Sequence, residues 1–290
     1  MHIQQPLVTV LIPTYRRIGG ILQRAVDSAL NQTYKNTEII VLDDGTELPI
    51  QPMEYKIGKI DKFIHFKENR GKASVINDGI RMAKGKYIVF LDDDNELIPT
   101  FLEETVPLLQ GTPSIVGAVQ VGRIIKGKTE TYARPYTGNF AASIDWGWLM
   151  KREVFDKIML DEKMYADEDM DLGIEFFKRF TSVILDKPLE ISHVNEEDSV
   201  CSPTPRRMKG MEYFVKKHRS FYKGNPNELR YLYRLAGRTF YRGGKRIKGL
   251  KYFYKSFFSQ PSKKSFMHLL IIHFGWYYYD KYMTYEESKL

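Results

Sequence analysis

Residues 87–95, YIVFLDDDN, join a short apolar run to three consecutive acids, and this junction decides how the chain folds. The run Tyr87–Leu91 is rich in β-branched and aromatic residues, as in a strand that is buried on both faces. Asp92, Asp93 and Asp94 follow at once, and carboxylates this close repel one another and raise each other's pKa. A divalent cation would remove that repulsion, because Mg²⁺ and Mn²⁺ prefer carboxylate oxygens. The alternative is a solvated acidic loop without a ligand.

Two similar runs precede this one, and amphipathic segments lie between them. Residues 8–12 (VTVLI) and 38–42 (EIIVL) have the composition of buried strands, and residues 63–66 are a further short candidate. Apolar residues at helical spacing predict two helices, with Ile21, Leu22, Ala25, Val26, Ala29 and Leu30 on the first and Val75, Ile76, Ile80 and Ala83 on the second. This alternation predicts an α/β fold with a parallel, doubly wound sheet.

Polar residues follow three of the predicted strands: Pro13-Thr14-Tyr15, Asp43-Asp44 and the three aspartates. In a parallel sheet these segments meet at one edge, where ligands bind in such folds. Tyr15 could stack on a base, and Asp44 could accept a hydrogen bond from a base or ribose. Arg70 and Lys72, at the start of the second helix, could bind phosphate. The alternatives are a partly buried aromatic ring, an Asp-Gly turn and a solvated basic turn.

The second half of the sheet region has a different pattern. We expect an antiparallel pair at residues 114–125 and 130–133, strands at 145–150 and 183–185, and a loop at 191–193. A helix over residues 167–180 opens with several acids, which suits its dipole, and one of them could instead act as a general base. His193 lies on the same expected edge and could contact a metal or a phosphate, although a lone histidine is more often structural.

Taken together, these segments resemble the inverting glycosyltransferases of family 2, which have the GT-A fold. The resemblance covers about residues 7–200. It rests on six segments in the order of the family: VTVLIPTYRR, LNQTYKN, EIIVLDDGT, NRGKASVINDGIRMAKGKYIVFLDDDN, WGWLMKREVFDKI and DEDMDLGIEFFKR. No single segment decides the matter, but six in order are specific.

The resemblance implies a role for each matching residue. Pro13, Tyr15 and Asp44, with Thr14 beside them, would bind the nucleotide, and Asp92 or Asp93 would lie near the ribose and diphosphate. Asp94 would bind Mn²⁺ or Mg²⁺, with His193 near the metal. Asp169 matches the base of the family's Glu-Asp pair. The residue before this pair is Asp167 where the family has glycine, so Asp167 remains a rival for the base.

These roles imply an inverting transfer from a nucleotide-diphosphate sugar, in the first instance a UDP-sugar, to an acceptor hydroxyl. The acceptor would be a saccharide or a lipid-linked saccharide, as in the synthesis of bacterial cell-surface polysaccharide or glycolipid. A nucleotidyltransferase would need a glycine-rich loop after the first strand, where this chain has PTYRR. Two further possibilities are a protein that binds nucleic acid or a membrane through its basic tail, and an inactive sugar-binding relative. We expect no nucleic-acid partner.

The composition changes near residue 202. Residues 203–290 contain 20 Lys/Arg, 5 Asp/Glu and 21 of the 39 aromatic residues, whereas residues 1–202 contain 24 Lys/Arg and 31 Asp/Glu. We therefore expect a catalytic domain over 1–202, with a nucleotide-sugar half at about 1–112 and an acceptor half at about 113–202. A basic helical extension would follow over 203–290. The single cysteine, Cys201, excludes an internal disulfide and fits a cytoplasmic location.

The extension has amphipathic helices that carry basic stripes. Asn225-Pro226 predicts a helix start, and Gly243-Gly244 predicts a break before the next helix. Arginines recur every four residues on the first of these helices, at Arg230, Arg234, Arg238 and Arg242. Either the helices pack on the catalytic domain and their cations are solvated, or they bind an anionic membrane surface. The second possibility would place the protein peripherally at the inner face of the membrane.

Overall fold

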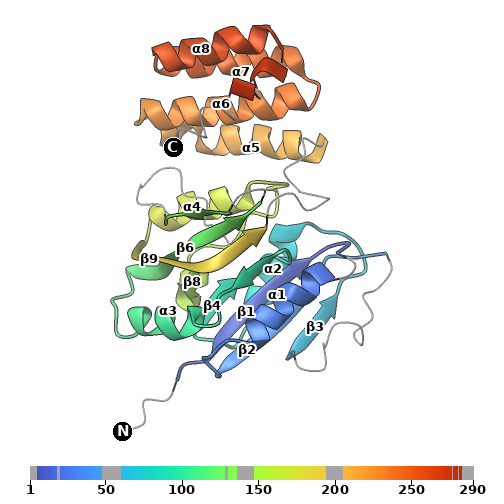
Figure 1. Ribbon diagram of the computed structural model, residues 1–290, viewed down its shortest axis with the longest axis vertical. Helices are drawn as coiled ribbons and strands as arrows, with labels where there is room; N and C mark the ends of the chain where they lie inside the picture. Colours follow the sequence, from blue (N-terminus) through green and yellow to red (C-terminus); the bar gives the residue numbers. More distant parts are fainter. Residues whose placement is uncertain are drawn as a thin grey trace. The chain divides into compact units, whose positions relative to one another are not determined.

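A computed structural model describes residues 5–17, 20–47, 60–127, 130–135, 147–193, 205–275, 277–279 and 281–282 of the 290-residue chain. The chain divides into two compact units (Figure 1). The sheet unit contains residues 1–162 and 168–197, and the helical unit contains residues 163–167 and 198–290. The predicted domain boundary at 202 and Cys201 lie outside the described residues.

The sheet unit is built on one mixed β-sheet. Its strands, in chain order, are β1 (Val8–Thr14), β2 (Thr37–Asp43), β3 (Lys62–His65), β4 (Tyr87–Phe90), β5 (Asn95–Leu97), β6 (Val116–Lys126), β7 (Glu130–Ala133), β8 (Leu149–Lys151) and β9 (Thr181–His193). They lie in the order β3-β2-β1-β4-β8-β6-β9-β5, with β7 paired to β6 (Figure 1). The first four are parallel, and β8 is antiparallel to both β4 and β6.

The parallel part of the sheet confirms the predicted convergence of strand ends. In β1, Thr14 stands opposite Asp43 of β2, and Leu11 stands opposite Phe90 of β4. The Leu91 N–H donates to the Leu11 carbonyl at 3.0 Å and continues this pairing up to Asp92. The polar segments that follow β1, β2 and β4 therefore leave the sheet at one edge.

Helices cover both faces of the sheet (Figure 1). One hydrophobic cluster joins the sheet to α1 (Gly20–Leu30) and α3 (Phe101–Leu109), and a second joins it to α2 (Lys72–Met82), η3 (Arg152–Asp156) and α4 (Glu168–Phe177). Side chains alternate between the faces along β1, so Val10 and Ile12 lie in the first cluster and Leu11 in the second. The predicted α/β class is confirmed.

Strand β9 differs from the prediction. The short strand at 183–185 and the loop at 191–193 are parts of one strand, which pairs parallel with β6 and antiparallel with β5. Pro188 obscured this continuity, because proline has no N–H to donate within a sheet. The structure accommodates Pro188 opposite Gly122, where the register of β6 shifts on both sides of the glycine.

Two other element boundaries also differ. The predicted strand at 145–150 is confirmed only at its end, since β8 begins at Leu149, and residues 145–146 lie outside the described part. The helix predicted from residue 167 begins at Glu168, because Asp167 has a φ of 61° in the left-handed region. The antiparallel pair of β6 and β7 agrees with the prediction.

The helical unit contains the helices α5 (Pro205–Tyr222), α6 (Pro226–Arg242), α7 (Arg246–Ser259) and α8 (Lys263–His273), and the described residues 277–279 and 281–282 after them are also helical. The Asn225 side chain caps α6 by accepting from the backbone N–H groups of Asn227 and Glu228, as expected. In the described part of the chain, no helix has the length and apolar character needed to span a bilayer.

The predicted arginine stripe is on α6, but it is not a free cationic surface. Arg230, Arg234 and Arg238 are half-buried, and only Arg242 is exposed. Arg230 donates to the Ser262 hydroxyl at 3.3 Å, and the Arg234 guanidinium lies 5.5 Å from the Tyr231 ring centre. Most of the stripe therefore packs within the helical unit.

The turn after β2 provides a test of the fold beside the candidate site. Gly45 has a φ of 76°, and a Cβ there would lie 2.6 Å from the backbone nitrogen of Asn69. Gly111 has a similar φ of 73° but open space around it. We expect Gly45→Ala to lower the free energy of unfolding by about 1–3 kcal/mol more than Gly111→Ala. Equal losses for the two variants in urea denaturation would contradict this account of the turn.

Candidate functional site

Two of the three aspartates after β4, Asp93 and Asp94, are held by groups at the end of β1 and just after it. The Thr14 hydroxyl donates to Asp93 Oδ2 at 2.7 Å. Arg17 Nη2 donates to Asp94 Oδ2 at 3.0 Å, and its Nε lies 3.5 Å from Asp93 Oδ1. The parallel pairing of β1 with β4 is what brings these groups within reach of one another.

Lys72 joins the aspartates to the second acid cluster. Its Nζ donates to Asp92 Oδ1 at 2.5 Å and lies 3.9 Å from Glu168 Oε1. Burial favours a lower pKa for Lys72, but the charges of Asp92, Glu168 and Asp169 outweigh burial and raise it above its ordinary value. One cation at the start of α2 therefore interacts with acids from the end of β4 and the start of α4.

The carboxyl of Asp93 has a raised pKa. Burial raises its pKa to about 6, and the charges of Asp94 and Asp92 add to the rise. The Thr14 hydroxyl and Arg17 work in the opposite direction. Asp93 therefore changes its charge near neutral pH, as groups in ligand sites often do.

Asp44 has a structural role that the sequence did not indicate. Its buried carboxylate accepts from the backbone N–H groups of Arg70 at 2.7 Å and Gly71 at 2.9 Å. These bonds hold the turn that starts α2 and so position Lys72. The predicted contact of Asp44 with a nucleotide stays a prediction, and each of its oxygens already has a protein partner.

Of the other nucleotide-binding candidates, Tyr15 is exposed, as stacking requires, whereas Pro13 is buried in β1. The Arg16 guanidinium lies 5.0 Å from the Tyr15 ring centre. Arg70 is directed away from the aspartates: it pairs with Asp78 at 2.5 Å and lies 4.3 Å from the Phe66 ring centre. The structure thus brings Lys72, but not the Arg70 side chain, to the acids.

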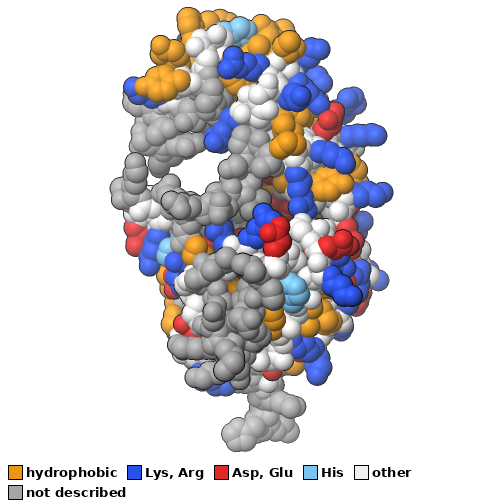
Figure 2. Space-filling view, turned by 90° about the vertical axis from the view of Figure 1, so that its right-hand side faces the viewer, with side chains coloured by type: hydrophobic (Ala, Val, Ile, Leu, Met, Phe, Trp, Pro, Cys, Tyr) orange, Lys and Arg blue, Asp and Glu red, His pale blue; other side chains and the backbone are white. Residues whose placement is uncertain are grey.

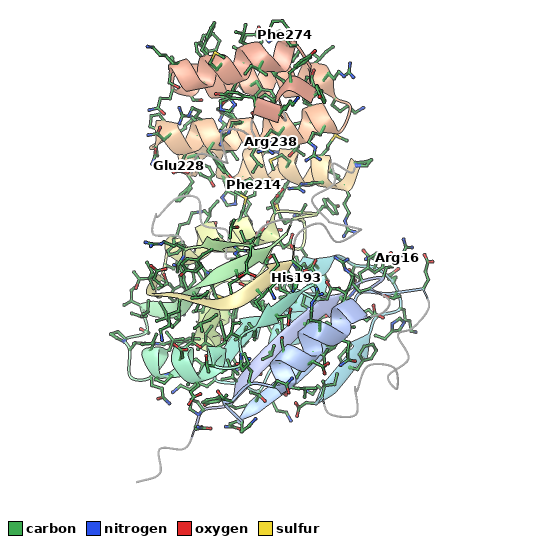
Figure 3. The ribbon with its side chains drawn as sticks, viewed as in Figure 1. Arg16, His193, Phe214, Glu228, Arg238 and Phe274 are labelled. Carbon is green, nitrogen blue, oxygen red and sulfur yellow. The ribbon has the colours of Figure 1, made fainter. Side chains whose placement is uncertain are left out.

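His193 lies at the end of β9 and has a partner that was not predicted (Figure 3). Its Nε2 is 2.7 Å from Glu96 Oε1, and the same oxygen is 3.6 Å from Arg24 Nε. Arg24 also donates to the Asp94 carbonyl at 3.0 Å. His193 is therefore connected to the aspartate segment through Glu96 and Arg24.

The predicted metal site can be compared with these positions. Among the described residues, no group of three or more His, Cys, Asp or Glu side chains is placed to hold a metal ion unaided. Mg²⁺ and Mn²⁺ often take only one or two protein carboxylates and complete their shell with water and substrate phosphate. Asp94, a half-buried carboxylate at the edge of the sheet, is chemically suited to that role. The metal assignments to Asp94 and His193 stay predictions.

The two candidates for the base lie in different units. Asp169, in the first turn of α4, is partly exposed in the sheet unit. Asp167 belongs to the helical unit, where its Oδ1 is 3.4 Å from Arg207 Nη2. Burial raises the pKa of Asp167, and Arg207 opposes the rise. The charge of Asp169 acts on Lys72, which contacts Asp92 at the edge of the sheet, and this placement favours Asp169 as the base.

Three residues of the site, Arg17, Arg24 and Glu96, were not predicted from the sequence. The position of Arg17, three residues after the last residue of β1, is a signal that could have found it. Arg24 lies on α1 and Glu96 on β5, a three-residue strand too short to give a pattern.

Comparison with known proteins agrees with this geometry. A family model described as glycosyl transferase family 2 matches residues 9–167. The chain belongs to this family. The match includes β1, β4 and the three aspartates and ends just before the Glu168-Asp169 pair.

Similar sequences come from several organisms. An uncharacterized glycosyltransferase of Rickettsia prowazekii (strain Madrid E) is 39% identical over 205 residues, 64% of this chain and 63% of the relative. The putative colanic acid biosynthesis glycosyl transferase WcaA of Escherichia coli (strain K12) is 25% identical over 236 residues, 74% of this chain and 82% of WcaA. This chain therefore spans just under two thirds of the rickettsial relative's length.

Solved structures share the fold at low sequence identity. A mannosyltransferase from Pyrobaculum calidifontis, in complex with GDP-Man and Mn²⁺, has a TM-score of 0.60 at 18% sequence identity. The match covers 92% of this chain and 79% of the mannosyltransferase chain. TarS of S. aureus, residues 1–349, has a TM-score of 0.57 at 11% sequence identity, and the match covers 88% of this chain and 92% of the TarS chain. The predicted GT-A fold is confirmed.

The raised pKa of Asp93 gives a prediction about stability and pH. The folded protein holds this proton up to about pH 6, whereas the unfolded chain releases it near pH 4, so wild-type stability falls as pH rises between these values. Asparagine does not titrate, so the Asp93→Asn variant does not lose stability in this way. The free energy of unfolding of the variant relative to wild type should therefore rise from pH 4 to pH 7, by up to about 3 kcal/mol. Urea denaturation in EDTA measures the difference, and a pH-independent difference would refute the assignment.

Proposed function

We propose that this protein is an inverting glycosyltransferase that moves a sugar from a nucleotide-diphosphate sugar to an acceptor hydroxyl. The observation that carries the proposal is the interaction of Lys72 with both Asp92 and Glu168. It links the acid segment at the edge of the parallel sheet, where ligands bind in such folds, to the segment that supplies a base. Family membership supports the same conclusion.

The proposed reaction is one direct displacement. The acceptor oxygen forms a bond to the anomeric carbon of the donor as the bond from that carbon to the diphosphate oxygen breaks. Asp169 takes the acceptor proton, and attack from the face opposite the leaving group inverts the configuration. Lys72 and Arg17 are the cations that would bind the departing diphosphate. No enzyme nucleophile is needed.

We propose Mn²⁺ or Mg²⁺ as the cofactor, with Asp94 and His193 as the protein residues that hold it and Asp92 or Asp93 near the ribose and diphosphate. The ion would neutralise charge that develops on the leaving diphosphate. Side chains of the protein position the other groups of the site. Arg17 and Thr14 orient the aspartates, and Asp44 holds the turn that positions Lys72.

The donor is proposed to be a UDP-sugar, with a GDP-sugar as the competing possibility. Structural neighbours support either base, since TarS is known in complex with UDP-GlcNAc and the Pyrobaculum enzyme with GDP-Man. The exposed ring of Tyr15 could stack on either base. For the acceptor we propose a saccharide or lipid-linked saccharide of a cytoplasmic polysaccharide pathway, a class suggested by the name of WcaA.

Hydrolysis of donors tests the proposal directly. Release of nucleoside diphosphate from a panel of UDP- and GDP-sugars should occur with one of them in Mn²⁺ or Mg²⁺ and stop in EDTA. Asp94→Ala should abolish it, whereas Glu103→Ala, which removes an exposed acid of α3, should leave it unchanged. Full activity of Asp94→Ala in EDTA would overturn the metal role, and no release from any donor would count against the transferase.

The base assignment gives a separate prediction. Asp169→Asn should lose at least about 10²-fold in kcat while donor affinity stays nearly constant, because a general base acts on the acceptor only. Asp156→Asn, an exposed acid on η3, is the control. A larger kcat loss in Asp167→Asn than in Asp169→Asn would transfer the role to Asp167.

A further inference from the structure

The last part of the helical unit has an unusual charge pattern. From residue 229 to residue 279 the sequence contains eleven Lys/Arg residues and no Asp or Glu. Five of these cations, Lys245, Arg246, Lys251, Lys255 and Lys263, are exposed on α7, α8 and the turn before α7. An exposed group of cations attracts anions and repels a second copy of itself. Any partner that covers it should therefore be anionic.

Helix α8 is apolar on its exposed face. Phe266, Leu270 and Phe274 recur every four residues, with exposed fractions of 52%, 42% and 69%. The opposite face packs inward, where His268 and Ile272 are buried. A helix with two apolar faces normally has both covered. At 11 residues it is about 16 Å long, far less than the roughly 30 Å of a bilayer core.

Helix α7 places cations beside this apolar face. Lys251 and Lys255 are exposed, as is the ring of Phe258, at 71%. Ring contacts join the two helices, with Phe257 6.2 Å from Phe266 and Tyr254 5.9 Å from His273. Figure 2 shows hydrophobic and basic side chains together at the end of the helical unit where α7 and α8 lie, and Phe274 lies at the C-terminal end of α8 (Figure 3).

The exposed side of α7 and the turn before it also border an open hollow. It has a volume of about 1010 Å³ and is lined by Lys245, Arg246, Lys248, Lys251, Tyr252 and Lys255, among others. Lys248 is paired with Glu212 at 2.8 Å. The amines at this hollow can each donate a hydrogen bond to a phosphate oxygen.

We infer that the face formed by α7 and α8 binds an anionic phospholipid surface. The apolar side chains of α8 enter the interface, and the α7 cations contact lipid phosphates, as in helices that lie in the plane of a membrane. Nucleic acid would match the charge but not the Phe266–Phe274 face. The binding is independent of the proposed transfer reaction, although it would bring the enzyme to a lipid-linked acceptor.

Vesicle flotation tests the inference on the full chain. The wild-type protein should bind vesicles of equal parts phosphatidylcholine and phosphatidylglycerol, and it should bind vesicles of phosphatidylcholine alone far less. High salt should weaken its binding to the anionic vesicles. Phe266→Ser/Phe274→Ser and Lys251→Gln/Lys255→Gln should each reduce binding at least about tenfold. The matched controls are Ile115→Ser/Ile184→Ser and Lys216→Gln/Arg219→Gln, which change exposed residues elsewhere and should bind like wild type.

Several outcomes would overturn the inference. The first is that the wild-type protein binds neither kind of vesicle. The second is that a control variant loses as much vesicle binding as the test variants. The third is that Phe266→Ser/Phe274→Ser binds vesicles as well as the wild type does. Equal affinity for a DNA duplex that competes with vesicles would assign the surface to nucleic acid. A dimer that Phe266→Ser/Phe274→Ser dissociates would assign it to a second copy. Unchanged melting temperatures and donor hydrolysis in every variant ensure that lost binding reflects the surface and not unfolding.

Discussion

The parallel pairing of β1 with β4 is the constraint on which the site depends. Leu11 stands opposite Phe90, and this register carries Thr14 and the aspartates off the same edge of the sheet. A shift by one residue would turn every side chain of β4 to the other face and move the Asp93 carboxylate out of reach of the Thr14 hydroxyl. The register is held by burial on both faces, since Val10 and Ile12 belong to one hydrophobic cluster and Leu11 to the other.

Charge balance at this edge explains why so many acids can lie together. Lys72 and Arg17 each contact carboxylates, so the aspartates do not face one another uncompensated. A diphosphate would bring more negative charge to the same two cations. The carboxylates would then need another positive partner, which is the chemical reason to expect a divalent cation beside Asp92 and Asp94. Burial raises the pKa of Asp93 to about 6, so this carboxyl resists a full negative charge without such help.

The sequence predicted the parallel strands and their polar ends because each signal is local: a buried apolar run and the residues directly after it. It did not predict features that depend on distant partners. The tip of β9 is a strand only because β6 and β5 pair with it, and Asp44 is structural only because Arg70 and Gly71 lie across the turn. Arg17 was missed for the same reason: its place three residues after β1 makes it a candidate, but only the folded structure shows that its guanidinium reaches Asp94.

The helical unit shows a related limit of periodicity. Repeats of three and four residues reveal a basic or apolar stripe, but they do not say which stripe other helices will cover. On α6 the regular arginine stripe is largely half-buried, with Arg230 bonded to Ser262. On α8 the apolar stripe stays exposed, because Ile272 on the opposite face is the one that packs against Phe253. Burial therefore moves the candidate binding surface from the α6 arginines to the α7 lysines and the α8 phenylalanines, a change that no count of charges in the sequence could have made.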